Sequence, residues 1–146
     1  MEPLIQEFIQ GKTYALVGAS RSGKKFGNTL LAEMKQRGYQ LRVVHPEAQQ
    51  IDGETCYPNL AALPGPVDGL VICVPPAQAG QVLREAAQAG IRRVWLQQGS
   101  QSPEVLALAK ELGLSPVTGK CLLMYAGPVG SVHAWHRAFA RLFGQY

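Results

Sequence analysis

Basic and small residues gather near the start of the chain, where a short apolar run gives way to a helical pattern. Residues 13–31 read TYALVGASRSGKKFGNTLL and predict a strand, a turn from Gly18, and a helix. Three basic residues lie in this turn: Arg21, Lys24 and Lys25. A helix start offers free backbone N–H groups and the positive end of the helix dipole, both of which favour anions. The residue types therefore predict a phosphate-binding junction.

Two common phosphate-binding patterns fit this stretch incompletely. Residues 18–25 match G-x-x-x-x-G-K, but Lys25 stands where a P-loop needs the Ser or Thr that holds magnesium. Ser20 stands where the dinucleotide pattern G-x-G-x-x-G requires its second glycine. A P-loop hydrolase is therefore disfavoured, and an NAD(P)-binding redox protein is kept as an alternative.

The elements that position this junction alternate between strand and helix. Apolar runs predict strands at residues 14–17, 41–44, 70–74, 94–96 and 115–117. Helical patterns predict three helices. The first starts near residue 29 and ends at Gly38, the second covers 77–89, and the third begins after Ser102, which is expected to be its N-cap. A loop with a short helix at 59–63 is expected across 47–66, and a last helix at about 131–143. The chain is predicted to be one α/β domain over 1–146, a doubly wound parallel sheet of about five strands between two helical layers.

In such a sheet, ligands bind along the edge where the strands have their carboxyl ends. The unusual residues of this chain follow the predicted strands at that edge: Gly18, Ala19, Ser20, His45, Pro46, Val74, Pro75, Pro76 and Gln98. The opposite edge offers Lys12, Arg42, Asp68, Arg92 and Arg93, which we interpret as solvated strand flanks. The site is therefore expected at the C-terminal edge.

The composition narrows the function classes. The chain has 146 residues, 47% hydrophobic and 16% charged, with a net charge of +4 that comes largely from the cluster at 21–25. That charge favours a small anionic ligand over nucleic acid. We find no membrane span or signal peptide and expect a cytoplasmic protein. Its three cysteines have no C-x-x-C spacing, so we expect reduced thiols and no metal site.

Together, these motifs resemble a known family, the small CoA-binding proteins related to the CoA-binding domain of succinyl-CoA synthetase α chains. The resemblance covers nearly the whole chain and is carried by VGASRSGKKFGN, HP, VPP, WLQQG and KC in the order of the predicted strands. It implies a Rossmann-like fold and coenzyme A as the ligand. Relatives commonly have NP where this chain has His45 and Pro46.

The resemblance also implies roles for individual residues. Gly18, Ala19 and Ser20 would lie along the pyrophosphate, and Lys25 or Arg21 would meet a phosphate. The HP and VPP segments would flank the adenosine or pantetheine portion. The chemistry agrees, because CoA carries several phosphates and rigid prolines suit its flexible arm. The candidate cofactor-binding residues are Gly18, Ala19, Ser20, Arg21, Lys24, Lys25, His45, Pro46, Val74, Pro75, Pro76 and Gln98.

Catalytic candidates are few. The synthetases related to this family use a phosphorylated histidine, but His45 is interpreted as lining the ligand, and His133 and His136 as residues of the last helix. Cys121 is expected near the thiol end of a bound CoA, where oxidation would give a mixed disulfide. We therefore favour a non-catalytic CoA-binding protein. The alternatives are an acyl-CoA enzyme using Cys121 or His45 and the NAD(P)-binding protein. A homodimer is expected if Trp135 or Phe143 is exposed.

Overall fold

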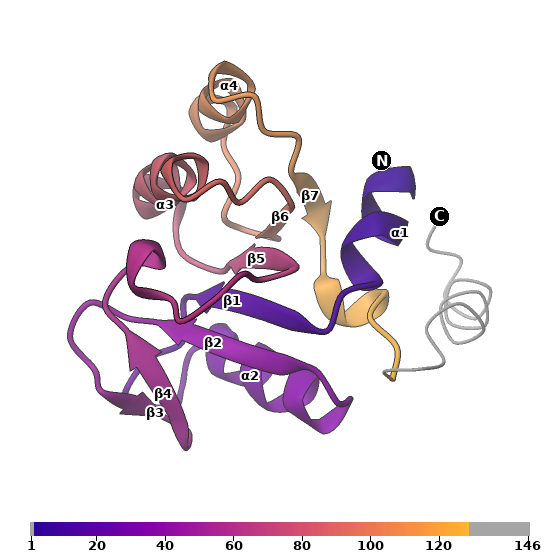
Figure 1. The fold of residues 1–146 in the computed structure, drawn as a ribbon. Coiled ribbons are helices and arrows are strands. Elements are labelled where there is room, and N and C mark those ends of the chain that lie inside the picture. Colours follow the sequence, from indigo (N-terminus) through magenta and orange to yellow (C-terminus); the bar gives the residue numbers. More distant parts are fainter. Residues whose placement is uncertain (1, 129–146) are drawn as a thin grey trace.

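The computed structural model describes residues 2–128, and these form a single twisted sheet between two layers of helices (Figure 1). The sheet has seven strands in the order β3-β4-β2-β1-β5-β6-β7. All neighbouring strands are parallel except β3 and β4. The strands are β1 (Thr13–Val17), β2 (Gln40–Val44), β3 (Gln50–Ile51), β4 (Glu54–Tyr57), β5 (Gly69–Ile72), β6 (Val94–Gln97) and β7 (Val117–Lys120). The predicted α/β doubly wound class is confirmed.

The predicted number of strands was wrong, because the segment 47–66 is not only a loop with a short helix. It contains the antiparallel hairpin β3–β4, which turns through Asp52 and Gly53 with φ values of 50° and 82°. Positive φ at both central residues is what a type I′ hairpin turn requires, and Asp-Gly is a favoured pair there. The hairpin extends the sheet beyond β2. The short helix is present as the 3-10 turn η1 (Leu60–Ala62).

At the other side of the sheet, the fifth strand was predicted two residues too early. β7 runs over Val117–Lys120 and not over 115–117. It pairs with β6 through Trp95 and Gln97, with an irregularity between these two residues. The segment 118–120, which we expected beyond the strand, therefore forms part of it.

The helices divide between the two faces of the sheet (Figure 1). One face is covered by α1 (Glu2–Ile9), α2 (Phe26–Gln36) and the 3-10 turn η2 (Leu122–Met124), which pack on the core cluster that contains Leu16, Val43 and Trp95. The other face is covered by α3 (Pro76–Gln88) and α4 (Pro103–Glu111). The predicted helix ends at Gly38 and Gly90 are confirmed: both lie just beyond C-caps and have positive φ.

The sequence-based prediction did not include α1, which contributes Ile5, Phe8 and Ile9 to the core. Phe8 stacks on Tyr14 with 5.0 Å between ring centroids, and the Tyr14 hydroxyl donates to the Phe8 carbonyl oxygen at 2.5 Å. Burial is the main cause that raises the pKa of Tyr14 far above its ordinary value. This helix closes the core beneath β1, β5 and β6.

None of the helices in residues 2–128 is long and apolar enough to cross a membrane. The predicted last helix at about 131–143, with His133 and His136, lies outside the described residues.

Candidate functional site

A cavity of about 580 Å³ opens at the C-terminal edge of the sheet, where β1, β2, β5 and β6 end. Ten of the twelve predicted site residues line it: Gly18, Ala19, Ser20, Lys25, His45, Pro46, Val74, Pro75, Pro76 and Gln98. Arg21 and Lys24 belong to the same turn as Ser20 and Lys25 but do not line the cavity. The parallel topology thus gathers residues that are up to 80 positions apart in the sequence.

Two glycines allow the backbone to pack tightly beneath this cavity. Gly18 has a φ of +131°, and a Cβ built on it would lie 2.2 Å from the Cys73 carbonyl oxygen. A Cβ on Gly27 would lie 2.3 Å from the Gly18 carbonyl oxygen. The end of β1 is therefore held between the end of β5 and the first turn of α2. A larger residue at either position would push the turn out of place.

Asn28 fixes the turn that follows Gly18. Its side chain is 4% exposed; its Oδ1 accepts the Ser20 N–H at 2.9 Å and its Nδ2 donates to the Ser20 carbonyl oxygen at 3.0 Å. The same Nδ2 donates to Asp52 Oδ2 at 2.9 Å. One buried amide thus ties the β1–α2 turn to helix α2 and to the β3–β4 hairpin.

The basic residues of this turn remain available to a ligand. Lys25 is the N-cap of α2 and its side chain makes no capping hydrogen bond. Within residues 2–128, neither Arg21 nor Lys24 nor Lys25 forms an ion pair. Cations at a helix N-terminus oppose the dipole by about 0.3–1 kcal/mol each, a cost that a bound anion would reverse.

The apolar side of the cavity comes from the start of α3 and from Phe26. Pro75 is the N-cap of α3 and Pro76 its first residue, so the VPP segment forms a rigid wall. Phe26, the first residue of α2, lines the cavity with 47% of its surface exposed. An exposed aromatic ring beside a turn with three basic residues offers a flat surface to a heterocycle or an apolar arm.

His45 is oriented by the backbone that follows it. Its Nδ1 accepts the N–H groups of Glu47 at 3.1 Å and Ala48 at 2.9 Å. A neutral imidazole whose Nδ1 accepts carries its proton on Nε2, which leaves Nε2–H as a donor for a ligand. This geometry suits a histidine that binds a ligand as a hydrogen-bond donor.

The far side of the cavity is built by the end of β6. Gln98 Nε2 donates to the Gly119 carbonyl oxygen at 3.3 Å, and the buried Ser100 hydroxyl donates to the Ile72 carbonyl oxygen at 3.2 Å. Cys73 also lines the cavity. Burial, and to a lesser extent the neighbouring Cys121, raise the pKa of the Cys73 thiol to about 11. Cys73 is therefore protonated at neutral pH.

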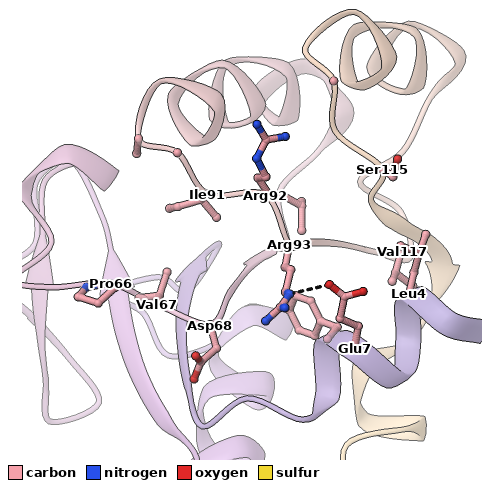
Figure 2. A pocket seen from close by; sticks show the side chains of 15 residues that line it. Leu4, Glu7, Pro66, Val67, Asp68, Ile91, Arg92, Arg93, Ser115 and Val117 are labelled. Carbon is pink, nitrogen blue, oxygen red and sulfur yellow. Dashed lines mark hydrogen bonds and ion pairs between the residues drawn. The ribbon is translucent and has the colours of Figure 1, made fainter.

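The N-terminal edge of the sheet differs from our expectation of solvated flanks. There, Asp68, Arg92 and Arg93 line a second cavity of about 570 Å³, together with α1 and the loops that precede β5, β6 and β7 (Figure 2). Arg93 Nε pairs with Glu7 Oε1 at 3.0 Å. Asp68 Oδ2 accepts the N–H groups of Lys12 and Thr13, which are the main causes of its lowered pKa.

Metal ligands do not gather in the described part of the chain. Residues 2–128 contain no group of three or more His, Cys, Asp or Glu side chains placed to hold a metal ion. Glu47 is the single carboxylate among the described residues that line the C-terminal cavity.

Sequence reasoning missed Phe26 and Cys73, which line the cavity, and several residues that shape the site from behind. Gly27 and Asn28 stand in the motif itself, and the glycine nine residues after Gly18 was a usable signal for close packing of helix on strand. Ser100, buried behind the end of β6, carried no comparable signal. Asp52 could have been placed in a turn from the Asp-Gly pair, but its contact with Asn28 depends on the tertiary fold.

The sequence is similar to that of known proteins. Residues 12–126 match the model of the CoA binding domain family. The chain is 31% identical over 124 residues to an ADP-forming acetate–CoA ligase II of Archaeoglobus fulgidus, covering 77% of this chain and 18% of the ligase. The chain therefore spans about a fifth of the length of the curated relatives it matches.

Solved structures agree with the fold. A conserved hypothetical protein from Pyrococcus furiosus superimposes with a TM-score of 0.73 at 35% identity, covering 77% of this chain and 97% of that one. A hypothetical protein from Pyrococcus horikoshii gives a TM-score of 0.75 at 26% identity, covering 84% and 86%. With the family model matching most of its length, this chain belongs to the CoA binding domain family.

Proposed function

We propose that this protein binds coenzyme A or an acyl-CoA across the C-terminal edge of the sheet, with the phosphates at the β1–α2 turn. The proposal rests mainly on the position of Lys25, which lies at the N-terminus of α2 and lines the cavity. This lysine forms no ion pair within the described residues. CoA has a pyrophosphate and a 3′-phosphate, so it has more anionic groups than one lysine can satisfy. Arg21 and Lys24 lie beside Lys25 in sequence and supply further cations.

The remaining parts of CoA match the other walls. A cavity of about 580 Å³ is within the usual size range of small-molecule sites. Phe26 and the VPP wall offer apolar surface to the adenine and the pantetheine arm, and His45 Nε2–H and Gln98 offer hydrogen bonds. A preformed wall of prolines limits the entropy lost when a flexible arm binds.

We propose that the protein binds this ligand without catalysing a reaction on it. The chain spans about a fifth of the length of the matched ligases, so the proposal is argued from the residues of its own cavity. In the described cavity, His45 uses Nδ1 to hold backbone N–H groups, and Glu47 has no second carboxylate beside it. These residues support recognition of a ligand better than general acid and base catalysis.

Calorimetry with CoA, dephospho-CoA, NAD and ATP, all without magnesium, tests the ligand class. CoA is expected to bind tightest, and dephospho-CoA more weakly because it lacks the 3′-phosphate. Tighter binding of NAD, or equal binding of all four, would contradict the proposal and favour a general dinucleotide site.

A double variant tests directly whether the β1–α2 turn binds the phosphates. Lys24→Ala combined with Lys25→Ala is expected to lower CoA affinity at least about tenfold, equivalent to ~1.4 kcal/mol, without lowering the stability of the free protein. Lys110→Ala is the matched control, because Lys110 lies in the last turn of α4 and does not line the cavity. Unchanged affinity in the double variant would remove the turn from the site.

A further inference from the structure

His45 closes a turn of the chain in addition to lining the cavity. Its Nδ1 accepts the N–H groups of Glu47 at 3.1 Å and Ala48 at 2.9 Å. These donors lie two and three residues further along the chain, as in the turns that Asn and Asp side chains close through an oxygen atom. In this chain, the atom that closes the turn is one that can take up a proton.

This turn forms one wall of the cavity. Its start is fixed in the sheet, because the His45 N–H donates to the Tyr57 carbonyl oxygen at 2.9 Å. Pro46 and Glu47 line the cavity, and Ala48 belongs to the core cluster on which α1 and α2 pack. The two hydrogen bonds to Nδ1 therefore shape the segment that faces the ligand, between an anchor in the sheet and an anchor in the core.

A proton on Nδ1 conflicts with this arrangement. Both nitrogens of a charged imidazole are donors, so an Nδ1–H would point at the two backbone N–H groups that Nδ1 accepts. Both hydrogen bonds would be lost, and the N–H groups of Glu47 and Ala48 would face a positive charge. Histidine changes its charge between about pH 5 and 8, so the conflict arises within the physiological range. The turn thus requires a neutral His45.

The groups around His45 do not offset this conflict. Within residues 2–128, His45 forms no ion pair with a carboxylate. The other titratable side chains that line the cavity are Lys25, Glu47 and Cys73, and Tyr57 of β4 is bonded to His45 through its backbone. Burial is the main cause that raises the pKa of Cys73 to about 11, so this thiol stays neutral when histidine titrates. Lys25 adds positive charge to the same cavity.

We propose that His45 couples CoA binding to a proton, an inference that rests on the proposed function. The neutral imidazole closes the turn and holds the wall that the ligand meets, whereas protonation opens the turn and weakens binding. CoA affinity therefore falls as pH falls. Linkage requires the reverse effect as well, so bound CoA holds His45 in its neutral form. His45 is in this sense a positioning residue, because it acts through the segment that follows it.

Calorimetric titration with CoA at about pH 7.5 and about pH 5.5 tests the coupling. His45→Asn is the matched variant, because the Asn Oδ1 can accept the same N–H groups and does not titrate. Between the two pH values, the wild type is expected to lose about tenfold more affinity than His45→Asn, since an ordinary histidine is about nine-tenths protonated at the lower one. The 3′-phosphate of CoA gains a proton near about pH 6, but equally for both proteins.

The free protein gives a second readout, which decides the question even if His45→Asn binds CoA too weakly to measure. In the wild type, the Glu47 and Ala48 amides are expected to be protected from hydrogen exchange at neutral pH and to lose that protection at the lower pH. In His45→Asn they should stay protected at both. His45→Ala, which has no acceptor, should lack the protection at both, so that Asn rescues what Ala removes.

The outcomes separate this inference from the proposed function. If the wild type and His45→Asn lose affinity equally, or if the wild type binds CoA more tightly at the lower pH, the proton coupling is wrong and the proposed function stands. The same holds if CoA binds and the wild-type Glu47 and Ala48 amides stay protected at both pH values. If CoA binds to the wild type at neither pH, both proposals fail.

Discussion

Two cavities of nearly equal size, about 580 and 570 Å³, lie at opposite edges of one sheet, and their charges are arranged differently. At the N-terminal edge, Arg93 is paired with Glu7, and Asp68 accepts two backbone N–H groups (Figure 2). At the C-terminal edge, Lys25 has no ion pair within residues 2–128. Arg92 at the N-terminal cavity also forms no ion pair within the described residues, so neither cavity size nor an unpaired cation separates the two edges by itself. The difference lies in where the cations stand, because Lys25 is at the N-terminus of a helix.

The directions of the helices add to the electrostatic difference between the two edges. α2 and α3 begin at the C-terminal edge, so the positive ends of their dipoles and their free N–H groups face an anion there. α3 and α4 end beside the second cavity, where Gly90 and Gly113 follow their C-caps. The negative ends of two dipoles disfavour an anion and favour the arginines present. The direction of the elements thus assigns opposite electrostatics to the two edges.

The largest effect is expected at Gly18, which belongs to the C-terminal edge alone. Gly18→Ala combines a left-handed φ with a contact of 2.2 Å to the Cys73 carbonyl oxygen, so β1 and β5 must separate. We expect the free energy of unfolding to fall by more than about 3 kcal/mol and CoA binding to be lost. Urea unfolding and calorimetry measure the two effects.

Gly99→Ala is the matched control for that variant. Gly99 also lines the C-terminal cavity and has a φ of +95°, but nothing lies within 4 Å of a Cβ built there. It should cost only the strain of the backbone conformation, about 1 kcal/mol. Equal losses in both variants would show that φ, and not the close approach of β1 and β5, sets the importance of Gly18.

The next effect is expected at Asn28, which acts on the turn without lining the cavity. Asn28→Ala removes both bonds to Ser20 and leaves buried polar groups unpaired, so the free energy of unfolding should fall by about 1–3 kcal/mol. CoA affinity should fall about tenfold because the turn is no longer fixed.

Asn59→Ala is the control for that experiment. Asn59 Oδ1 accepts the Ala62 N–H at 2.9 Å in η1, away from both the turn and the cavity. Its loss should lower stability by about 1 kcal/mol and leave CoA affinity unchanged. If Asn28→Ala also leaves affinity unchanged, the turn does not need Asn28 to hold the phosphates.

The central strands and the edge at which they end could be predicted from the sequence. β5 and β6 are buried on both faces, so GLVI and VWLQ stand out as continuous apolar runs. Because helices connect successive strands, the strands are expected to run parallel, and their carboxyl ends are then expected at one edge of the sheet. Gly18, His45 and Pro75 could be predicted at one edge because each directly follows a predicted strand.

The parts that escaped prediction depend on contacts between distant segments. Gln50 and Ile51 make a strand of two residues, too short for a periodic signal, although the Asp-Gly pair after them marks a hairpin turn. α1 has a usable pattern in Leu4, Ile5 and Phe8, but its role in lining the second cavity depends on where β5 and β6 begin. The same holds for Asp68, whose partners lie 55 and 56 residues away.

The smallest effect is expected at Asp68, and it should appear in stability alone. Its folded-state pKa lies below the ordinary value of 3.8, chiefly because it accepts hydrogen bonds from the N–H groups of Lys12 and Thr13. Its stabilisation is therefore fully present above the ordinary pKa and is lost as pH falls through the lower, folded-state pKa. Asp68→Asn should lower the free energy of unfolding by about 1 kcal/mol at neutral pH, and the difference from wild type should vanish in acid. Urea unfolding at several pH values measures this dependence. CoA affinity should not change, and a weaker CoA complex in this variant would mean that the second cavity takes part in binding after all.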